Sequence, residues 1–464
     1  MNDKNTPKGN YNFGNYYFSY LLRHQKIYLC LLLIIIFAIS MSSNYRQEKP
    51  LLIGGESYYY LSSAQQELPF HPLTLLFRVI PDQAAYLIPL FISMGTILLF
   101  YSLAKRINIL EERVFFIVLF YILTPTYIFT SLTLSSYSLF LLLILLGVNL
   151  LLLETKNKYF ALLPFLFASL IDGFSGPLLL AGLSGYFFLI KKNKERFQNI
   201  LLVSIAAMIV LNAFLLKAPF FLGPFTVQNK AADLISDLGS FSGVGVFAIL
   251  LAVAGFIASW QKKNIPLLLS ALAVFTTAYI FNTHTTFFFS LLIVILAAIG
   301  FTNLLEQSWK LSILRNAVLL LLLLGISFSA VAHLDRISEY SPTAIDQKTL
   351  EWIQKNTNEE AVVLSAPENS YYISYFAKRK TVFTLHLDYS ENYQLSKDIF
   401  TAFYIDKLFP LLEKNKVSII YVSEEMTQTL PPGQEFLFLL QNERFKLLYS
   451  AGNAEVWSFE EAKQ

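Results

Sequence analysis

Long apolar runs constrain this chain more than any other feature. Hydrophobic residues make up 55% of the sequence and charged residues only 14%, with a mean hydropathy of +0.52. A helix needs about 20 consecutive apolar residues to cross the hydrocarbon core of a bilayer, and about eleven runs approach that length. We therefore predict a polytopic α-helical membrane protein, with spans at residues 27–43, 84–104, 114–130, 134–153, 159–171, 176–190, 199–216, 244–260, 265–281, 286–305 and 311–332.

Asp172-Gly173 interrupts the apolar stretch at residues 159–190. The two pieces on either side are short, whereas one continuous helix would be too long for a single crossing. We predict a hairpin that reaches the outer surface at Asp172.

Basic residues between the runs predict the orientation, because Lys and Arg accumulate in short cytoplasmic loops. With the N-terminus inside, the inner segments carry Lys4, Lys8, Arg23, Lys26, Lys105, Arg106, Arg113, Lys156, Lys158, Lys191, Lys192, Lys194, Arg196, Lys262, Lys263, Lys310 and Arg315. The outer segments before the C-terminal part carry only Arg46, Lys49, Arg78, Lys217 and Lys230. We therefore predict a multi-pass protein of the cell (plasma) membrane with a cytoplasmic tail at residues 1–26.

Charge and cysteine content exclude several classes of function. The net charge of +3 is small, and no basic cluster with interleaved aromatic residues suggests a nucleic-acid partner. The single cysteine, Cys30, lies in the first span, so neither a disulfide nor a cysteine-based metal site is expected. No small-residue cleavage site follows this span, which we interpret as a retained anchor.

From about residue 333 the composition becomes that of a soluble domain. Helical patterns at 343–356, 369–378, 393–414 and 435–442 alternate with strand patterns at 361–365, 381–385 and 417–422. A hairpin across Gly452-Asn453 joins two further strands. This alternation predicts an extracytoplasmic α/β domain at 333–464 with a largely parallel sheet, after a transmembrane domain at 27–332.

Two long outer loops, at residues 44–83 and 217–243, offer room for chemistry. The first contains Glu56, preceded by two glycines and followed by three tyrosines. An acid at the edge of a membrane is a functional candidate by default, because it is costly to keep there. The loop also contains two amphipathic stretches, 57–65 and 71–80, which are suited to lie in the interface.

The order of these parts resembles the GT-C superfamily of integral membrane glycosyltransferases. Gly55-Glu56-Ser57-Tyr58-Tyr59-Tyr60 resembles the family's acidic residue in the first outer loop, and His71-Pro72-Leu73 its later turn. Thr124-Pro125-Thr126-Tyr127-Ile128, leading into Leu134-Ser135-Ser136-Tyr137, resembles its Pro-centred third and fourth helices. Leu350-Glu351-Trp352-Ile353 and Ala361-Val362-Val363-Leu364-Ser365 resemble the exported domain of members related to oligosaccharyltransferase catalytic subunits.

The resemblance implies transfer of a sugar from a polyprenyl-phosphate-linked donor, on the outer face, to a glycan, lipid or protein acceptor. In that reaction a carboxylate serves as general base for the acceptor hydroxyl, a role that falls to Glu56. Solvation of Glu56, or its pairing with Arg78, is the structural alternative. Direct displacement by the acceptor would invert the anomeric carbon.

Several other residues are candidates for the catalytic site, and each also has a simpler structural interpretation. Asp172 is a possible second acid, although capping of the hairpin is the simpler interpretation. The donor phosphate needs cations or donors, and the outer candidates are His71, Arg78, Lys217, Lys230 and His284, each of which also fits an interfacial position. Tyr58 and Tyr59 are suited to stack on sugar or prenyl groups, or to form an aromatic belt.

The chain also departs from the family. Oligosaccharyltransferase subunits carry Trp-Trp-Asp-X-Gly after the first exported strand, where this chain has Ala366-Pro367-Glu368-Asn369-Ser370, so transfer to an Asn sequon is not expected. The usual loop Asp is Glu56 here, and many members have an acid where this chain has Ser135-Ser136. These departures leave open a divergent acceptor, a metal-free mechanism or lost activity.

No metal ligands or cofactor are specified by the sequence, although a divalent cation such as Mg²⁺ or Mn²⁺ is compatible with the resemblance. The competing function is a non-enzyme: a GT-C-like scaffold or a transporter of lipid-linked glycans. A transporter is expected to have ionisable residues at mid-membrane and repeated halves. The predicted spans have neither feature, which favours the enzyme over the transporter but leaves the scaffold open.

Overall fold

The computed structural model describes most of the chain. The described residues are 24–46, 52–65, 72–80, 84–106, 111–153, 156–171, 234–240, 243–260, 286–337, 341–383, 389–430 and 435–460, with short stretches at 177, 180–181, 202–207, 209, 269, 272–277 and 279. The predicted spans at 176–190, 199–216 and 265–281 lie largely outside them.

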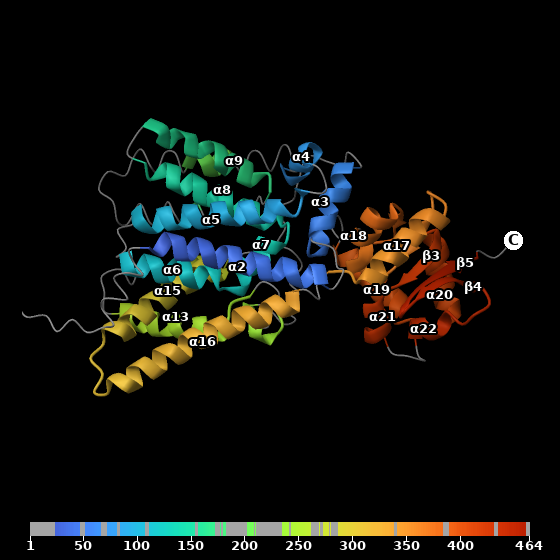
Figure 1. Ribbon diagram of the computed structural model, residues 1–464. Coiled ribbons are helices and arrows are strands. Elements are labelled where there is room, and N and C mark those ends of the chain that lie inside the picture. The colour runs from blue at the N-terminus through green and yellow to red at the C-terminus, as the bar shows by residue number, and fades with distance from the viewer. Residues whose placement is uncertain are drawn as a thin grey trace, which may run out of the picture.

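A bundle of apolar helices forms the larger part of the molecule (Figure 1). Within the described residues, three helices are long and apolar enough to cross a membrane, or four if a bent pair counts as one span. The chain is thus a helical membrane protein, and the full count of eleven spans stays a prediction. The bundle consists of α2 (Gln25–Arg46), α5 (Leu87–Arg106), α6 (Glu111–Ile122), α7 (Pro125–Leu132), α8 (Ser136–Leu151), η2 (Lys156–Ala161), α9 (Leu162–Ser169), α13 (Val246–Ser259), α15 (Thr286–Glu306) and α16 (Ser312–Ile337).

The predicted span at 114–130 is not one straight helix. It is divided between α6 and α7, which meet at an angle of 58°. Pro125 is the cause, because proline disfavours helical backbone at the preceding residue and fits the first turn of a new helix. Thr124 caps α7 by accepting a hydrogen bond from the Tyr127 amide (3.4 Å). After the break, the end of α7 lies beside the start of α3, where Thr133 pairs with Ile53.

Glycines let α13 and α15 approach each other closely. A Cβ atom on Gly255 would lie 1.9 Å from the Leu296 carbonyl oxygen, and one on Gly300 would lie 2.2 Å from the Leu251 carbonyl oxygen. Small residues at such contacts are typical of membrane helices, whose association depends on backbone proximity and van der Waals packing. The backbones of α13 and α15 are therefore in direct contact at these glycines.

Two short helices, α3 (Gly55–Gln65) and α4 (Pro72–Val79), correspond to the predicted amphipathic stretches. Figure 1 shows α3 and α4 at the end of the bundle that faces the C-terminal α/β region. They pack on α5 through a shared apolar cluster that includes Leu61, Leu73 and Ile88. Aromatic residues of the C-terminal region join the same cluster, so α3 lies between the two parts of the chain.

The C-terminal α/β region contains one five-stranded sheet in the order β2-β1-β3-β5-β4. The first three strands are parallel, as predicted, whereas β5 runs antiparallel to both β3 and β4. The elements are α17 (Ala344–Asn356), β1 (Val362–Leu364), η7 (Pro367–Asn369), α18 (Ser370–Tyr372), the π-helix η8 (Ile373–Ala377), β2 (Lys380–Thr381), α19 (Tyr389–Phe400), α20 (Ile405–Lys414), β3 (Val417–Val422), α21 (Glu424–Thr429), α22 (Glu435–Leu439), β4 (Phe445–Ala451) and β5 (Ala454–Phe459).

The prediction of a single long helix at 393–414 is wrong. Two helices, α19 and α20, take its place, and the connection exposes Phe403 and Tyr404. Asp406 then lies in the first turn of α20, where its negative charge favours a helix start. The short helix α21, which the sequence analysis missed, starts at the cap Ser423, whose hydroxyl accepts a hydrogen bond from the Met426 amide (3.3 Å).

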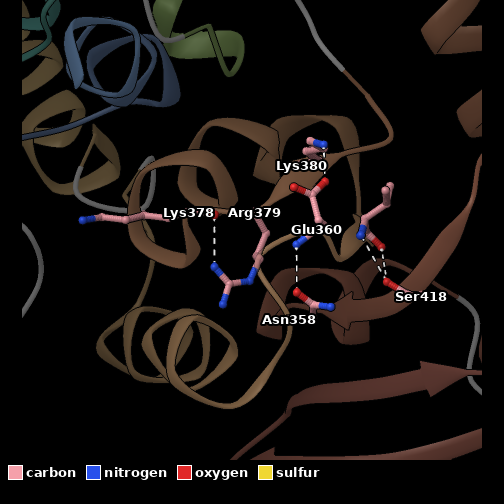
Figure 2. Close-up of polar contacts among 7 residues, drawn as sticks. Asn358, Glu360, Lys378, Arg379, Lys380 and Ser418 are labelled. Atoms are coloured by element: carbon pink, nitrogen blue, oxygen red, sulfur yellow. Dashed lines mark hydrogen bonds and ion pairs between the residues drawn. The ribbon is translucent and has the colours of Figure 1, made fainter. Parts of the chain in front are cut away.

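The basic triplet Lys378-Arg379-Lys380, drawn in Figure 2, contains one buried residue, Arg379. Arg379 Nη2 donates to the carbonyl oxygens of Gln354 and Thr357, each at 2.7 Å. These carbonyls belong to the end of α17, where a cation is favourable. Its neighbours Lys378 and Lys380 are both exposed, and Lys380 forms an ion pair with Glu360 at 2.6 Å.

We expect Gly300→Val to lower the apparent melting temperature of the purified protein in detergent. The added side chain meets the α13 backbone, and overpacking of this kind costs about 1–3 kcal/mol of folding free energy. Val253→Leu, on an exposed side of α13, is the matched control and should leave the melting temperature unchanged. Equal melting temperatures for Gly300→Val and the wild type would contradict the close helix contact.

Candidate active site

The two glycines before Glu56 have separate structural reasons. Gly54 has φ +83°, a backbone conformation that favours glycine. Gly55 lies under the Tyr371 ring, since a Cβ atom on Gly55 would be 2.7 Å from Tyr371 Cδ2. The first glycine therefore permits the turn into α3, and the second lets the C-terminal region approach it.

Ser57 ties α3 to the connection between α7 and α8. Its hydroxyl donates to the Ile53 carbonyl oxygen (2.7 Å) and accepts from the Leu134 amide (2.8 Å). Ile53 also pairs with Thr133 as an isolated parallel bridge. These bonds fix the start of α3 beside the start of α8.

Glu56 lies at this junction, partly buried, with its carboxylate at the amino end of α8. Glu56 Oε1 accepts hydrogen bonds from the Ser136 amide (3.0 Å), the Ser136 hydroxyl (2.9 Å) and the Tyr60 hydroxyl (3.1 Å). A helix amino end carries partial positive charge and unpaired N–H groups, so it stabilises a carboxylate. Glu56 Oε2 accepts no hydrogen bond from a described residue, which leaves one oxygen of the carboxylate for a ligand.

Ser136 and Tyr60 are hydrogen-bond partners of Glu56 that the sequence analysis missed. The sequence analysis noted Ser135-Ser136 only because many family members have an acid at this place. In the structure, Ser136 is the main partner of Glu56. Tyr60 is four residues after Glu56 and so shares its face of α3, a spacing that could have indicated the contact. Burial raises the pKa of the Tyr60 phenol well above its usual range, and the nearby Glu56 carboxylate raises it further. Tyr60 therefore remains a hydrogen-bond donor.

Tyr58 and Tyr59 lie on other sides of α3. Tyr58 is only 2% exposed, and its ring lies 5.2–5.3 Å from the rings of Tyr372, Tyr375 and Phe376. Its hydroxyl donates to the Leu52 carbonyl oxygen (2.9 Å). Tyr58 is thus placed as a contact of the C-terminal region, where its ring is closed to a sugar or prenyl group.

Tyr59 is more accessible than Tyr58. It is partly buried and meets the rings of Tyr60 and Tyr371 edge to face, at 5.2 and 5.6 Å. Because Tyr60 contacts Glu56, Tyr59 is one ring removed from the carboxylate. A ligand role for Tyr59 stays a prediction.

Arg78 lies in the last turn of α4 with an exposed side chain. It forms no ion pair with Glu56, so the structural alternative of a Glu56–Arg78 pair is not observed. The other predicted site residues, namely His71, Asp172, Lys217, Lys230 and His284, lie outside the described residues.

Asp237 is an acid with a structural role as a helix cap. It lies in the short helix η4 (Ser236–Leu238). One carboxylate oxygen accepts from the Val246 amide (2.7 Å) and the other from the Ser329 hydroxyl (2.6 Å). Asp237 thereby closes the amino end of α13 and joins it to α16.

No model of a known protein family matches this sequence, and no curated protein sequence matches it either. Solved structures do match. The apo oligosaccharyltransferase of Archaeoglobus fulgidus gives a TM-score of 0.56 at 13% identity, covering 87% of this chain and 70% of that one. The archaeal oligosaccharyltransferase AglB from the same organism, in complex with an inhibitory peptide and a dolichol-phosphate, gives 0.55 at 13% identity, covering 94% and 75%.

A mycobacterial protein has a similar fold. The arabinofuranosyltransferase AftD gives a TM-score of 0.56 at 13% identity, over 92% of this chain and 41% of the longer AftD chain. At identities this low, the structural likeness shows a shared fold and does not show a shared activity. This chain therefore has the fold of the GT-C membrane glycosyltransferases, as the resemblance in its sequence predicts.

Proposed function

We propose that this chain is a membrane glycosyltransferase that moves a sugar from a polyprenyl-phosphate-linked donor to an acceptor hydroxyl on the outer face. The observation that carries the proposal is the Glu56 carboxylate. Three donors hold its Oε1 atom at the amino end of α8, while Oε2 accepts no hydrogen bond from a described residue. The likeness of the fold to AglB, whose structure holds a dolichol-phosphate, supports a lipid-linked donor.

In this proposal Glu56 Oε2 is the general base. It takes the proton of the acceptor hydroxyl while the hydroxyl oxygen bonds to the anomeric carbon. The bond from that carbon to the phosphate oxygen breaks, and its electron pair leaves with the lipid phosphate. The attack comes from the face opposite the phosphate, so the anomeric configuration is inverted.

The leaving phosphate carries negative charge and requires cations or hydrogen-bond donors. Arg78, Lys217, Lys230, His71 and His284 remain the proposed sources on the outer face, and Asp172 the proposed second acid. The exposed position of Arg78 in α4, next to α3 in the chain, fits this role. The acceptor remains a glycan, a lipid or a protein.

We expect Glu56→Gln to reduce transfer by about 10²–10⁴-fold, the usual contribution of general-base catalysis. The amide oxygen can still accept from Ser136 and Tyr60, so the fold should persist. The assay offers the full chain in liposomes a panel of polyprenyl-phosphate sugars and compares Glu56→Gln with Glu360→Gln, an exposed acid of the α/β region.

Two outcomes would contradict the proposal. Equal transfer by the wild type and Glu56→Gln would remove Glu56 as the base. Absence of transfer from every donor, with a correctly folded wild type, would favour the non-catalytic scaffold.

Tyr60→Phe tests the orientation of the carboxylate. The variant keeps the ring and loses the donor to Oε1, and a hydrogen bond to a charged group contributes about 1.5–3 kcal/mol. We expect kcat/KM to fall by about tenfold or more on that basis. Tyr449→Phe, whose ring stacks on Trp352 in the α/β region (4.9 Å), is the control and should retain full transfer.

A further inference from the structure

The groups around Glu56 bear on whether the site uses a divalent cation. All three partners of Oε1 are hydrogen-bond donors: the Ser136 amide, the Ser136 hydroxyl and the Tyr60 hydroxyl. Hydrogen bonds to an ionised acceptor are stronger than bonds between neutral groups, and the amino end of α8 adds partial positive charge. These three donors and the amino end of α8 therefore stabilise the negative charge of Glu56.

A divalent cation needs hydrogen-bond acceptors around it instead of donors. Mg²⁺ and similar ions prefer oxygen acceptors in near-octahedral geometry, with carboxylates among them. Among the described residues, no three His, Cys, Asp or Glu side chains come together in a group that could hold a metal ion. At the start of α8, Ser136 presents a hydroxyl and an amide hydrogen to Glu56 instead of a second carboxylate. The described residues at Glu56 therefore do not fit a divalent cation.

We propose that Ser136, at the amino end of α8, replaces a divalent cation at Glu56, so that the site works without a metal ion. Ser136 is a positioning residue, because it acts by holding Oε1 and turning Oε2 toward the acceptor. The catalytic consequence rests on the proposed function. The prediction about metal binding does not depend on it.

Metal binding can be measured without any sugar transfer. The full chain in detergent is titrated with Mn²⁺ and followed by electron paramagnetic resonance, with Glu56→Gln in parallel. We expect no Mn²⁺ site that depends on Glu56. A bound Mn²⁺ ion in the wild type that is lost in Glu56→Gln would overturn the proposal.

Ser136→Asp supplies the acid that the site lacks. Asp is favourable in the first turn of a helix, so the variant is expected to fold. We expect it to gain a Mn²⁺ site that disappears when Glu56→Gln is added, and we expect the neutral control Ser136→Asn to gain none. Equal Mn²⁺ binding by Ser136→Asp and Ser136→Asn would contradict the claim that Ser136 stands where a metal ligand would.

Kinetics test the same point where transfer is measurable. We expect full activity in EDTA, about a tenfold loss of kcat/KM in Ser136→Ala from the lost hydrogen bond, and recovery in Ser136→Thr, which keeps the hydroxyl. Ser138→Ala is the control, since Ser138 in the same turn donates to the Ser135 carbonyl oxygen (2.6 Å). Activity that EDTA abolishes and Mg²⁺ or Mn²⁺ restores would overturn the proposal. A chain without any transfer would instead count against the proposed function and leave the Mn²⁺ result standing.

Discussion

The junction between the start of α3 and the start of α8 is the contact on which the site depends. Ser57 binds the Leu134 amide, and Glu56 binds the amide and hydroxyl of Ser136. These bonds satisfy backbone donors at the start of α8, where helix N–H groups have no partner within the helix. The same bonds set the position of the carboxylate. The same hydrogen bonds therefore anchor the start of α3 and orient Glu56.

The C-terminal α/β region packs against α3 on the side opposite the bundle. Its rings at Tyr372, Tyr375 and Phe376 surround Tyr58, and Tyr371 covers Gly55. Aromatic pairs at these separations contribute about 0.5–1.5 kcal/mol beyond their buried area. The region thus acts as a second support for the helix that carries Glu56.

Local features of the sequence predicted much of the fold, whereas contacts between residues far apart in the sequence could not be predicted. Apolar runs predicted helices such as α5 and α15, and alternating patterns predicted β3 and β5. Glu56 was found because an acid beside a membrane is unusual. Ser136 was not, because 80 residues separate it from Glu56 and nothing in either segment alone indicates their contact.

The three consecutive tyrosines show the same limit. A helix turns by about 100° per residue, so neighbours in the sequence face different surroundings. Tyr58 consequently meets the α/β region, while Tyr60 meets Glu56. The sequence predicted an aromatic surface near Glu56 without indicating which ring would have which partner. That assignment required the position of the α/β region, which depends on long-range packing.

Capping alone does not account for Glu56. The amino end of α8 already has a local cap, because the Ser135 hydroxyl accepts from the Tyr137 amide (3.3 Å). Asp237 shows what a purely structural carboxylate does in this protein, since it uses both oxygens, one on the Val246 amide and one on the Ser329 hydroxyl. Glu56 reaches α8 from another helix and places a single oxygen on it. An acid held by one oxygen, with the other unused by the described residues, supports the proposal that Glu56 is the base.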